Sequence, residues 1–500
     1  MKGKILLGIA LVYWVVSFGW LLRYEAYPEL FTSSLEGYKG LLSRDVLITD
    51  SWMKILFKDS PIGYSHTSVE VADSNPSENY SVRNRMQLKM KLMGEVSNVH
   101  VDTTTTLNSM HELQKFSFSM FTRGYTLKLQ AQRLDARKFN ITTTTGTSTE
   151  KRIVEIPPDV VIYSPVTELA IKKLRPGQQL HMKTIDPATM TVANILIRAT
   201  GREEITVGTN RYDTTVVVMD YRGSDVRSWI DDKGNLVKQD TPFGWTMETC
   251  SSAEAFNVIK TSAAPDDMLS NMAVRYQGRL RSPTNALSIR MQLLGVSFER
   301  RELETDRQTV DNIDGARLEL NVRRCIFPDR GMLPASIPDA VREHLKPSPG
   351  LQSDHPDIIA AAADITRNAS SDTAKARAIQ DWVYTHVGKE SAITLPSALD
   401  VLRTMKGDCN EHTYLYVALA RAAGLPSKTT VGIVFHENAF YYHAWPSVWI
   451  GEWLETDPTW GQFGVDATHI ALFHGDLQEQ LNLVKVMGQL SIRILEEQNQ

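Results

Sequence analysis

The sequence predicts an α+β protein with three parts: an apolar N-terminal helix, a large antiparallel β-rich region and a smaller C-terminal domain of helices and strands. An uncharged apolar segment opens the chain, and a long region then alternates apolar and polar residues with the period of two that half-buried strands show. Helical periodicity becomes prominent after a proline-rich stretch. We expect these parts at residues 1–25, 50–325 and 356–500, with a linker at 326–355.

The composition is that of a folded globular protein with several domains. Hydrophobic residues make up 42% of the 500 positions and charged residues 22%, which suffices for a core in each domain. The formal net charge is -4, so there is no basic excess and we expect no nucleic-acid partner. The chain lacks a glycine-rich phosphate loop, a dinucleotide fingerprint and an EF-hand pattern, so we expect no cofactor.

Residues 1–25 predict a membrane anchor or a signal sequence. Lys2 and Lys4 precede an uncharged run over residues 5–22, which reaches the shortest length that spans a bilayer as a helix. Lysines favour the cytoplasmic side, so the bulk of the chain is expected outside the cytoplasm, in the periplasm or the extracellular space. We favour an uncleaved anchor; a signal peptide with a weak cleavage site at residues 17–19 and a buried core helix are the alternatives.

Residues 50–325 predict antiparallel strands and no catalytic constellation. The alternation is clearest over residues 86–92, 116–120 and 125–129. A hairpin is expected around Gly234, because glycine adopts the positive φ of a tight turn and apolar pairs flank it. We expect a curved sheet that binds or positions a partner or acts as a spacer. A division of this region into two domains near residues 264–284 stays open.

Residues 326–355 contain five prolines and little periodicity, which predicts an extended linker and the clearest domain boundary of the chain. Beyond the linker, residues 357–366 and 373–387 carry the pattern of helices, the second with apolar residues on one face. Ser371 or the next residue is expected to cap the second helix.

The segment 406–412 reads Lys-Gly-Asp-Cys-Asn-Glu-His and precedes an apolar-periodic run that ends at Gly424. Cys409 is therefore expected to open a helix. The first N–H groups of a helix are unpaired and carry the positive end of its dipole. We expect the Cys409 thiol to lose its proton more easily there, beside N–H groups that could hold an oxyanion.

Three strands are expected after this helix, over residues 428–435, 441–450 and 453–456. His443 lies near the start of the second strand, and Asp457 follows the third. A nucleophile at a helix N-terminus, a histidine on a facing strand and a carboxylate on the next strand form the arrangement that cysteine-based acyl transfer requires.

The motifs of this segment resemble those of the transglutaminase-like superfamily, whose catalytic core is papain-like. In order along residues 370–460 they read Gly-Asp-Cys, Ala-Arg-Ala-Ala-Gly-Leu-Pro, His-Ala-Trp and Trp-Leu-Glu-Thr-Asp-Pro-Thr. The resemblance implies Cys409 as the nucleophile, His443 as the general base and Asp457 as the orienting acid. One departure is Ser447, where related sequences often carry a glutamate.

The activity implied by the resemblance is hydrolysis or acyl transfer at a peptide or carboxamide bond of a peptide or protein substrate, through a thioester. The residues do not decide between water and an amine as the second nucleophile, and we lean to hydrolysis. A non-catalytic cell-envelope binding or scaffold protein with the same fold is the alternative. Cys409 and His412 supply only one end of a zinc pattern, so we expect no metal.

The other cysteines and late histidines are expected to be structural. If Cys409 is catalytic, Cys250 and Cys325 remain as a disulfide or as two buried thiols, and both alternatives stay open. His469 and His474 stand apart from the motifs and are expected to have structural roles.

Overall fold

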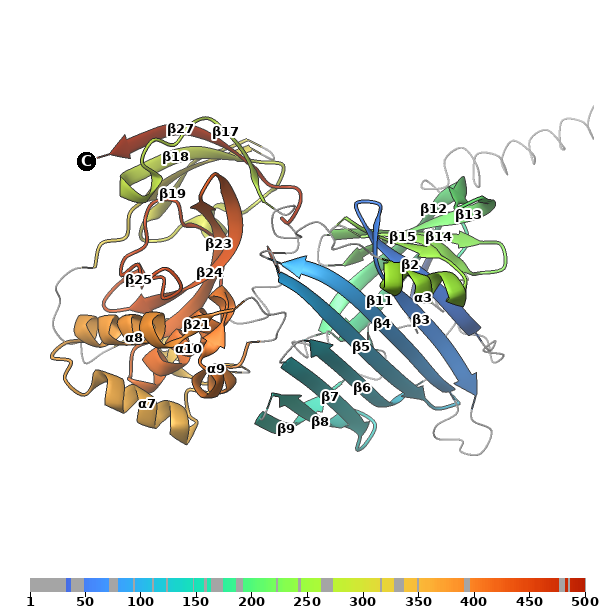
Figure 1. The fold of residues 1–500 in the computed structure, drawn as a ribbon, viewed down its shortest axis with the longest axis horizontal. Coiled ribbons are helices and arrows are strands. Elements are labelled where there is room, and N and C mark those ends of the chain that lie inside the picture. Colours follow the sequence, from blue (N-terminus) through green and yellow to red (C-terminus); the bar gives the residue numbers. More distant parts are fainter. Residues whose placement is uncertain are drawn as a thin grey trace, which may run out of the picture.

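The computed structural model has the expected mixed architecture of a large β-rich region followed by helices and strands (Figure 1). It describes residues 33–36, 49–71, 80–92, 95–109, 112–122, 125–146, 148–156, 160–162, 174–185, 192–221, 224–241, 244–261, 273–314, 317–327, 337–348, 350–390, 396–475, 482–483 and 486–499. The expected anchor or signal sequence at residues 1–25 lies outside these ranges. Within them, no helix has both the length and the apolar character needed to cross a membrane.

One sheet contains sixteen of the strands in the described ranges. They are β1 (Ser33–Glu36), β2 (Thr49–Phe57), β3 (Ser60–Val71), β4 (Tyr80–Leu92), β5 (Glu95–Leu107), β6 (Leu113–Thr122), β7 (Tyr125–Arg133), β8 (Lys138–Thr145), β9 (Ser148–Glu155), β10 (Val160–Ile162), β11 (Gln178–Ile185), β12 (Val192–Val207), β13 (Asn210–Tyr221), β14 (Ser224–Asp231), β15 (Leu236–Asp240) and β16 (Trp245–Thr249). Two antiparallel meanders, β2 to β9 and β11 to β16, join where β16 pairs with β2. β1 and β10 pair in parallel with β11.

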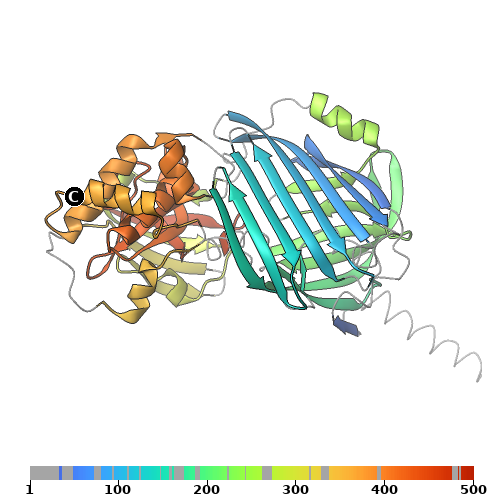
Figure 2. The same cartoon turned by 90° about the horizontal axis from the view of Figure 1, so that it is seen from below.

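The large sheet bends so that the inward faces of both meanders share one hydrophobic core (Figures 1 and 2). Phe116 and Ile141 of the first meander and Ile197 and Met219 of the second belong to this core. The alternation in the sequence arises because every second side chain of a strand points to the same face. The hairpin expected around Gly234 is confirmed, since it joins β14 to β15 and Gly234 has a φ of 79°.

Two smaller sheets of five and four strands, and one pair of short parallel strands, follow the helix α3 (Ser252–Thr261). The five-stranded sheet, in the order β17-β27-β18-β20-β19, is built from β17 (Arg275–Gln277), β18 (Ala286–Leu294), β19 (Gln308–Asp314), β20 (Arg317–Arg323) and β27 (Ser491–Asn499). The four-stranded sheet, in the order β25-β24-β23-β26, is built from β23 (Ser427–His436), β24 (Ala439–Trp449), β25 (Trp453–Glu455) and β26 (Ile470–His474). The three strands expected after the cysteine helix are therefore confirmed as β23, β24 and β25.

The two smaller sheets share a core, to which Ile289 and Leu320 contribute from one sheet and Ile433 and Phe440 from the other. Strands that the sequence assigns to the β-rich region thus pack with the C-terminal domain. The change from the large sheet to the next one falls between β16 and β17 and not in the proline-rich stretch. The division of the chain into domains at 326–355 remains a prediction.

Helices cover one face of the four-stranded sheet, and the five-stranded sheet covers the other (Figure 1). The helices are α7 (Pro356–Thr366), α8 (Asp372–His386), α9 (Ala398–Thr404) and α10 (Cys409–Ala422). α10 is central, because it packs against β23 and β24 on one side and against α7, α8 and α9 on the other. The two helices expected after the linker are confirmed, and Ser371 caps α8 by accepting from the N–H of Ala374 at 3.1 Å. Shorter elements are η3 (Pro283–Asn285), α5 (Arg300–Leu303), α6 (Asp339–Arg342), η4 (Glu343–Leu345), β21 (Gly388–Lys389) and β22 (Lys406–Gly407).

A buried ion pair ties the five-stranded sheet to the four-stranded sheet. Arg307, which precedes β19, donates to Glu455 of β25 at 2.7 Å, and only 7% and 4% of the two side chains are exposed. Arg307 also donates to the backbone carbonyls of Arg323 and His469. Burial alone would raise the pKa of Glu455, but the charge and the hydrogen bond of Arg307 outweigh it and lower the pKa.

Replacing Arg307 by methionine leaves the Glu455 carboxylate buried without its cation. We expect the free energy of unfolding to fall by about 3–5 kcal/mol in urea titrations followed by tryptophan fluorescence. The matched control is Arg301→Met, since the Arg301 side chain is 84% exposed; its effect should stay within about 0.5 kcal/mol. Equal effects of the two substitutions would show that the ion pair does not hold the two sheets together.

Candidate active site

The N-terminus of α10 positions Cys409. Asp408 is the N-cap residue, and its carboxylate accepts from the backbone N–H of Asn410 at 2.8 Å. Glu411 reaches back to the N–H of Asp408 at 2.9 Å, which completes a capping box. The expectation that Cys409 opens a helix is confirmed. Its thiol lies in the first turn, where backbone N–H groups have no helical partner.

Gly407 leaves room for this cap. An ideal Cβ atom at position 407 would lie 2.1 Å from the Cβ atom of Glu411, because Glu411 folds back over the glycine. A larger residue would displace the Glu411 side chain from the N–H that it caps. The Gly-Asp-Cys motif is therefore one local unit, in which Gly407 makes space, Asp408 caps the helix and Cys409 is presented at its start.

The packing of α10 against β24 brings the Cys409 thiol to the strand that carries His443. Burial is the largest influence on the thiol and raises the pKa of Cys409 well above its usual range, and the negative charge of Asp408 adds to this rise. The backbone N–H of Ala444 opposes it by a hydrogen bond to the sulfur. The expectation of a more acidic thiol is thus wrong for the resting site, where loss of water around the sulfur raises the pKa of Cys409.

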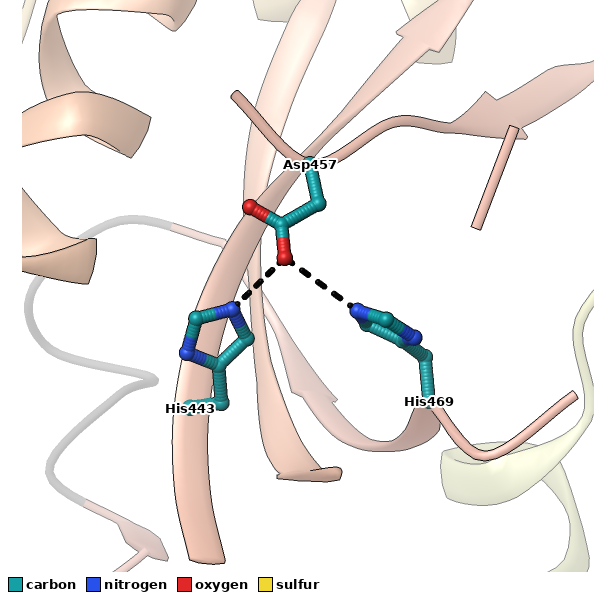
Figure 3. Close-up of side chains that lie close together, drawn as sticks. All are labelled: His443, Asp457 and His469. Atoms are coloured by element: carbon teal, nitrogen blue, oxygen red, sulfur yellow. Dashed lines mark hydrogen bonds and ion pairs between the residues drawn. The ribbon is translucent and has the colours of Figure 1, made fainter. Parts of the chain in front are cut away.

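His443 and Asp457 form a buried hydrogen-bonded pair. The Nε2 atom of His443 lies 2.9 Å from Oδ2 of Asp457, and the side chains are 6% and 0% exposed. The second ring nitrogen, Nδ1, is directed away from the carboxylate (Figure 3). The structure therefore brings these two residues together as the sequence predicted. Nδ1 of His443 is the ring nitrogen that can meet a proton donor.

The Asp457 carboxylate is held on both oxygens. Oδ1 accepts from the backbone N–H groups of Thr459 at 2.7 Å and Trp460 at 3.3 Å. Oδ2 accepts from His443 and from a second imidazole, that of His469. Burial by itself would raise the pKa of Asp457, but the charge and the hydrogen bonds of the two histidines outweigh it and hold the pKa well below its usual range.

His469 is the residue of this site that sequence reasoning missed. Its Nε2 atom lies 3.3 Å from Oδ2 of Asp457, its Nδ1 atom lies 3.2 Å from Oδ1 of Asp466, and the side chain is fully buried (Figure 3). The available signal was the segment 466–469, Asp-Ala-Thr-His, which places a carboxylate three residues before a histidine in a turn.

Aromatic rings pack against both His443 and His469. The indole of Trp460 stacks on His443 with ring centroids 4.6 Å apart and an angle of 13° between the planes. Trp445 lies on β24 two residues beyond His443, and its ring is 5.1 Å from that of His469 in an edge-on contact. These contacts fix the orientation of both imidazoles and limit the access of water to the Asp457 carboxylate.

His443, Asp457 and His469 form the one group of side chains in the described ranges that could hold a metal ion. The ligand atoms of His443, Asp457 and His469 all lie within 4.8 Å of one another. Both imidazoles already direct a ring nitrogen to one oxygen of Asp457 at hydrogen-bonding distance, so the carboxylate is satisfied by protons and we assign no metal. His412 contacts two backbone carbonyls, those of Asp408 at 2.7 Å and Val387 at 3.2 Å, and is not available as a ligand beside Cys409.

The cysteines are all free thiols, so the alternative of a disulfide between Cys250 and Cys325 is not realised. Cys325 is buried, and its sulfur accepts from the backbone N–H of Glu455 at 3.3 Å. Burial raises the pKa of Cys325 to about 12. Burial also raises the pKa of Cys250, which is only partly covered.

Comparison with known proteins assigns residues 359–458 to the transglutaminase-like superfamily, by the match of that family's model. The kyphoscoliosis peptidases of Mus musculus and Homo sapiens are 30% and 29% identical over 124 and 122 residues. Each match covers 21% of this chain and 18% of the relative, so the chain spans less than a fifth of the length of these curated relatives.

Two solved structures are similar over part of the chain. A candidate cysteine protease from Cytophaga hutchinsonii has a TM-score of 0.31 at 20% identity, covering 42% of this chain and 81% of its own. The periplasmic domain of TgpA from Pseudomonas aeruginosa has a TM-score of 0.26 at 17% identity, covering 40% of this chain and 77% of its own.

His474, on β26, gives a prediction for stability against pH. Burial and the neighbouring charge of Lys428 lower the pKa of His474 to about 4. Unfolded histidine takes up a proton near pH 6.5, so between about pH 6.5 and pH 4 the unfolded state binds a proton that the folded state does not. Wild type should therefore lose more unfolding free energy than His474→Gln on going from pH 7 to pH 4.5. Parallel losses in urea titrations would contradict this.

Proposed function

We propose that the transglutaminase-like domain makes this protein a cysteine hydrolase that cleaves peptide or carboxamide bonds through a thioester at Cys409. The observation that supports this most strongly is the buried hydrogen bond between Asp457 and His443, which lies on β24, the strand against which the Cys409 helix packs. The superfamily includes cysteine peptidases and acyltransferases, which fits a nucleophilic thiol at this position.

The raised pKa of the Cys409 thiol means that His443 has to accept its proton as the reaction begins. In the proposed first step, Nδ1 of His443 takes the proton while the sulfur attacks the carbonyl carbon, and the carbonyl oxygen becomes an oxyanion. The backbone N–H of Cys409, at the helix start, is the proposed donor to that oxyanion. His443 then gives the proton to the leaving amine, and the thioester remains.

Asp457 keeps His443 in the required tautomer. Because Nε2 of His443 donates to Asp457, Nδ1 carries the lone pair that accepts the thiol proton. The Asp457 carboxylate also stabilises the imidazolium that forms. In the second half of the reaction, His443 removes a proton from the water that attacks the thioester. The carbon–sulfur bond then breaks, the acid leaves, and His443 returns its proton to the sulfur of Cys409.

Water and a primary amine can both resolve the same thioester, so transfer to an amine is the alternative within this chemistry. We favour hydrolysis because the matched domain is short and the sequence carries no dedicated amine-binding motif. The substrate class is a peptide or protein.

The proposed location is outside the cytoplasm with a tether in the membrane. The support is the uncharged segment 5–22 behind Lys2 and Lys4. The large β-rich sheet would then bind or position a cell-envelope partner near the catalytic domain. A protein that binds such a partner without catalysis is the competing function, and the reactivity of Cys409 separates the two.

Alkylation of Cys409 by iodoacetamide, read at each cysteine by mass spectrometry across pH, tests the catalytic pair. Wild type should label at Cys409 near neutral pH, because His443 accepts the thiol proton as the sulfur attacks the reagent, whereas Cys325 has no such base beside it. His443→Ala should label Cys409 only at strongly alkaline pH, since burial raises the pKa of the thiol. Cys325, with a pKa of about 12, is the internal reference that stays unlabelled near neutral pH. Identical Cys409 profiles for wild type and His443→Ala would reject catalysis and favour the binding function.

Glutamine-containing peptides, incubated with and without a primary amine, test hydrolysis against transfer. We expect glutamate products or shorter peptides without added amine, and no amine-linked product above a few per cent with it. Cys409→Ala should abolish turnover, and Cys250→Ala should leave it unchanged because Cys250 lies outside the domain. Products that require the amine would reassign the enzyme to acyl transfer.

A further inference from the structure

We propose that His469 is a positioning residue of this site: a charged imidazolium that fixes the Asp457 carboxylate and reduces the negative charge that Asp457 presents to His443. The inference rests on the proposed function, because it concerns the proton that His443 takes from Cys409. It goes beyond the three residues of the sequence motifs, since His469 belongs to a later segment of the chain.

The charge on His469 follows from its two partners. Both ring nitrogens face carboxylate oxygens, Nε2 that of Asp457 at 3.3 Å and Nδ1 that of Asp466 at 3.2 Å. A neutral imidazole has one N–H group, so one nitrogen would direct its lone pair at an anionic oxygen. Only the imidazolium donates at both positions. The arrangement is therefore satisfied when His469 carries a proton on each nitrogen.

The surroundings of His469 support this charge state. The side chain faces Asp457 and Asp466, and the ring of His443 lies 5.9 Å from that of His469 at the same oxygen of Asp457. The guanidinium of Arg307 binds the backbone carbonyl of His469. Burial would lower the pKa of His469, but the hydrogen bonds and charges of the two carboxylates outweigh it and raise the pKa. The charge of Arg307 is matched by Glu455, its own buried partner.

Asp466 is itself held in place. Its Oδ1 atom accepts from the N–H and the hydroxyl of Thr468 at 2.9 and 2.6 Å, and its Oδ2 atom accepts from the side chain of Gln462 at 3.0 Å. Because Asp466 cannot turn away without losing these bonds, it holds the imidazole of His469 towards Asp457. The chain of contacts thus runs from Asp466 through His469 to Asp457 and His443.

Sharing one carboxylate oxygen between two imidazoles affects proton transfer. A lone Asp457 would act on His443 with its full negative charge, which favours the imidazolium over the neutral imidazole that accepts the thiol proton. The nearby positive charge of His469 offsets part of that attraction. The neutral imidazole of His443 is therefore favoured more than it would be beside Asp457 alone.

The test is the pH profile of Cys409 alkylation in the full-length protein, kept in detergent, for wild type, His469→Gln and His474→Gln. Glutamine keeps a hydrogen-bond donor at position 469 but removes the charge. We expect the acid limb of the profile to move up by about one pH unit in His469→Gln, as loss of a charge within a few ångström predicts. His474→Gln removes a histidine that bonds Thr430 and not Asp457, and should leave the limb in place.

Asp466→Asn is the second variant, needed because His469→Gln could fail to fold, which circular dichroism detects. It removes one of the two charges that stabilise the imidazolium, so we expect a smaller shift in the same direction. Suppose that both variants fold, that their profiles do not shift, and that labelling in wild type still depends on His443. This result would overturn the proposed role of His469 and leave the proposed function standing. Labelling in wild type that ignores His443→Ala would overturn the proposed function as well.

Discussion

The buried carboxylate of Asp457 is the constraint on which the rest of the candidate site depends. Its oxygens accept hydrogen bonds from β24, from the turn that follows β25 and from the segment that leads into β26. A buried charge is tolerated only when it is paired and hydrogen-bonded, so these three parts of the chain have to meet at one point. The need to pair the Asp457 carboxylate therefore fixes both the arrangement of the four-stranded sheet and the orientation of His443. A change in either would expose the carboxylate to water or remove one of its hydrogen bonds.

Features with a local cause could be predicted from the sequence. The start of α10 at Cys409 follows from cap residues within four positions of each other, and the strands of the large sheet follow from their alternation. Features that depend on distant residues could not be predicted. Arg307 is 148 positions from its partner Glu455, and His469 looks isolated until the fold places it against Asp457. The pKa of Cys409 was expected to fall because the helix start is visible in the sequence, whereas the burial that raises this pKa is a property of the fold.

The boundary between the β-rich region and the C-terminal domain shows a related limit. Prolines indicate irregular backbone, and residues 337–348 have only short helical turns there. They do not indicate where one hydrophobic core ends and the next begins. β27 pairs with β18 in the five-stranded sheet, across some two hundred positions of sequence, and both strands contribute to the core that lies against β23 and β24. Strand pairing over such a separation has no signature in local composition.

The stacking of Trp460 has an optical consequence. Its indole lies against His443, with ring planes 13° apart, and also against the exposed ring of His436, with centroids 5.1 Å apart. A protonated imidazole quenches the fluorescence of an indole that it touches, and the contact is an attractive one between a cation and a π system. The emission of Trp460 therefore follows the charge on both histidines. Trp460 is one of ten tryptophans in the chain, so its response is read as the difference between the emission of the wild type and that of a Trp460→Phe variant.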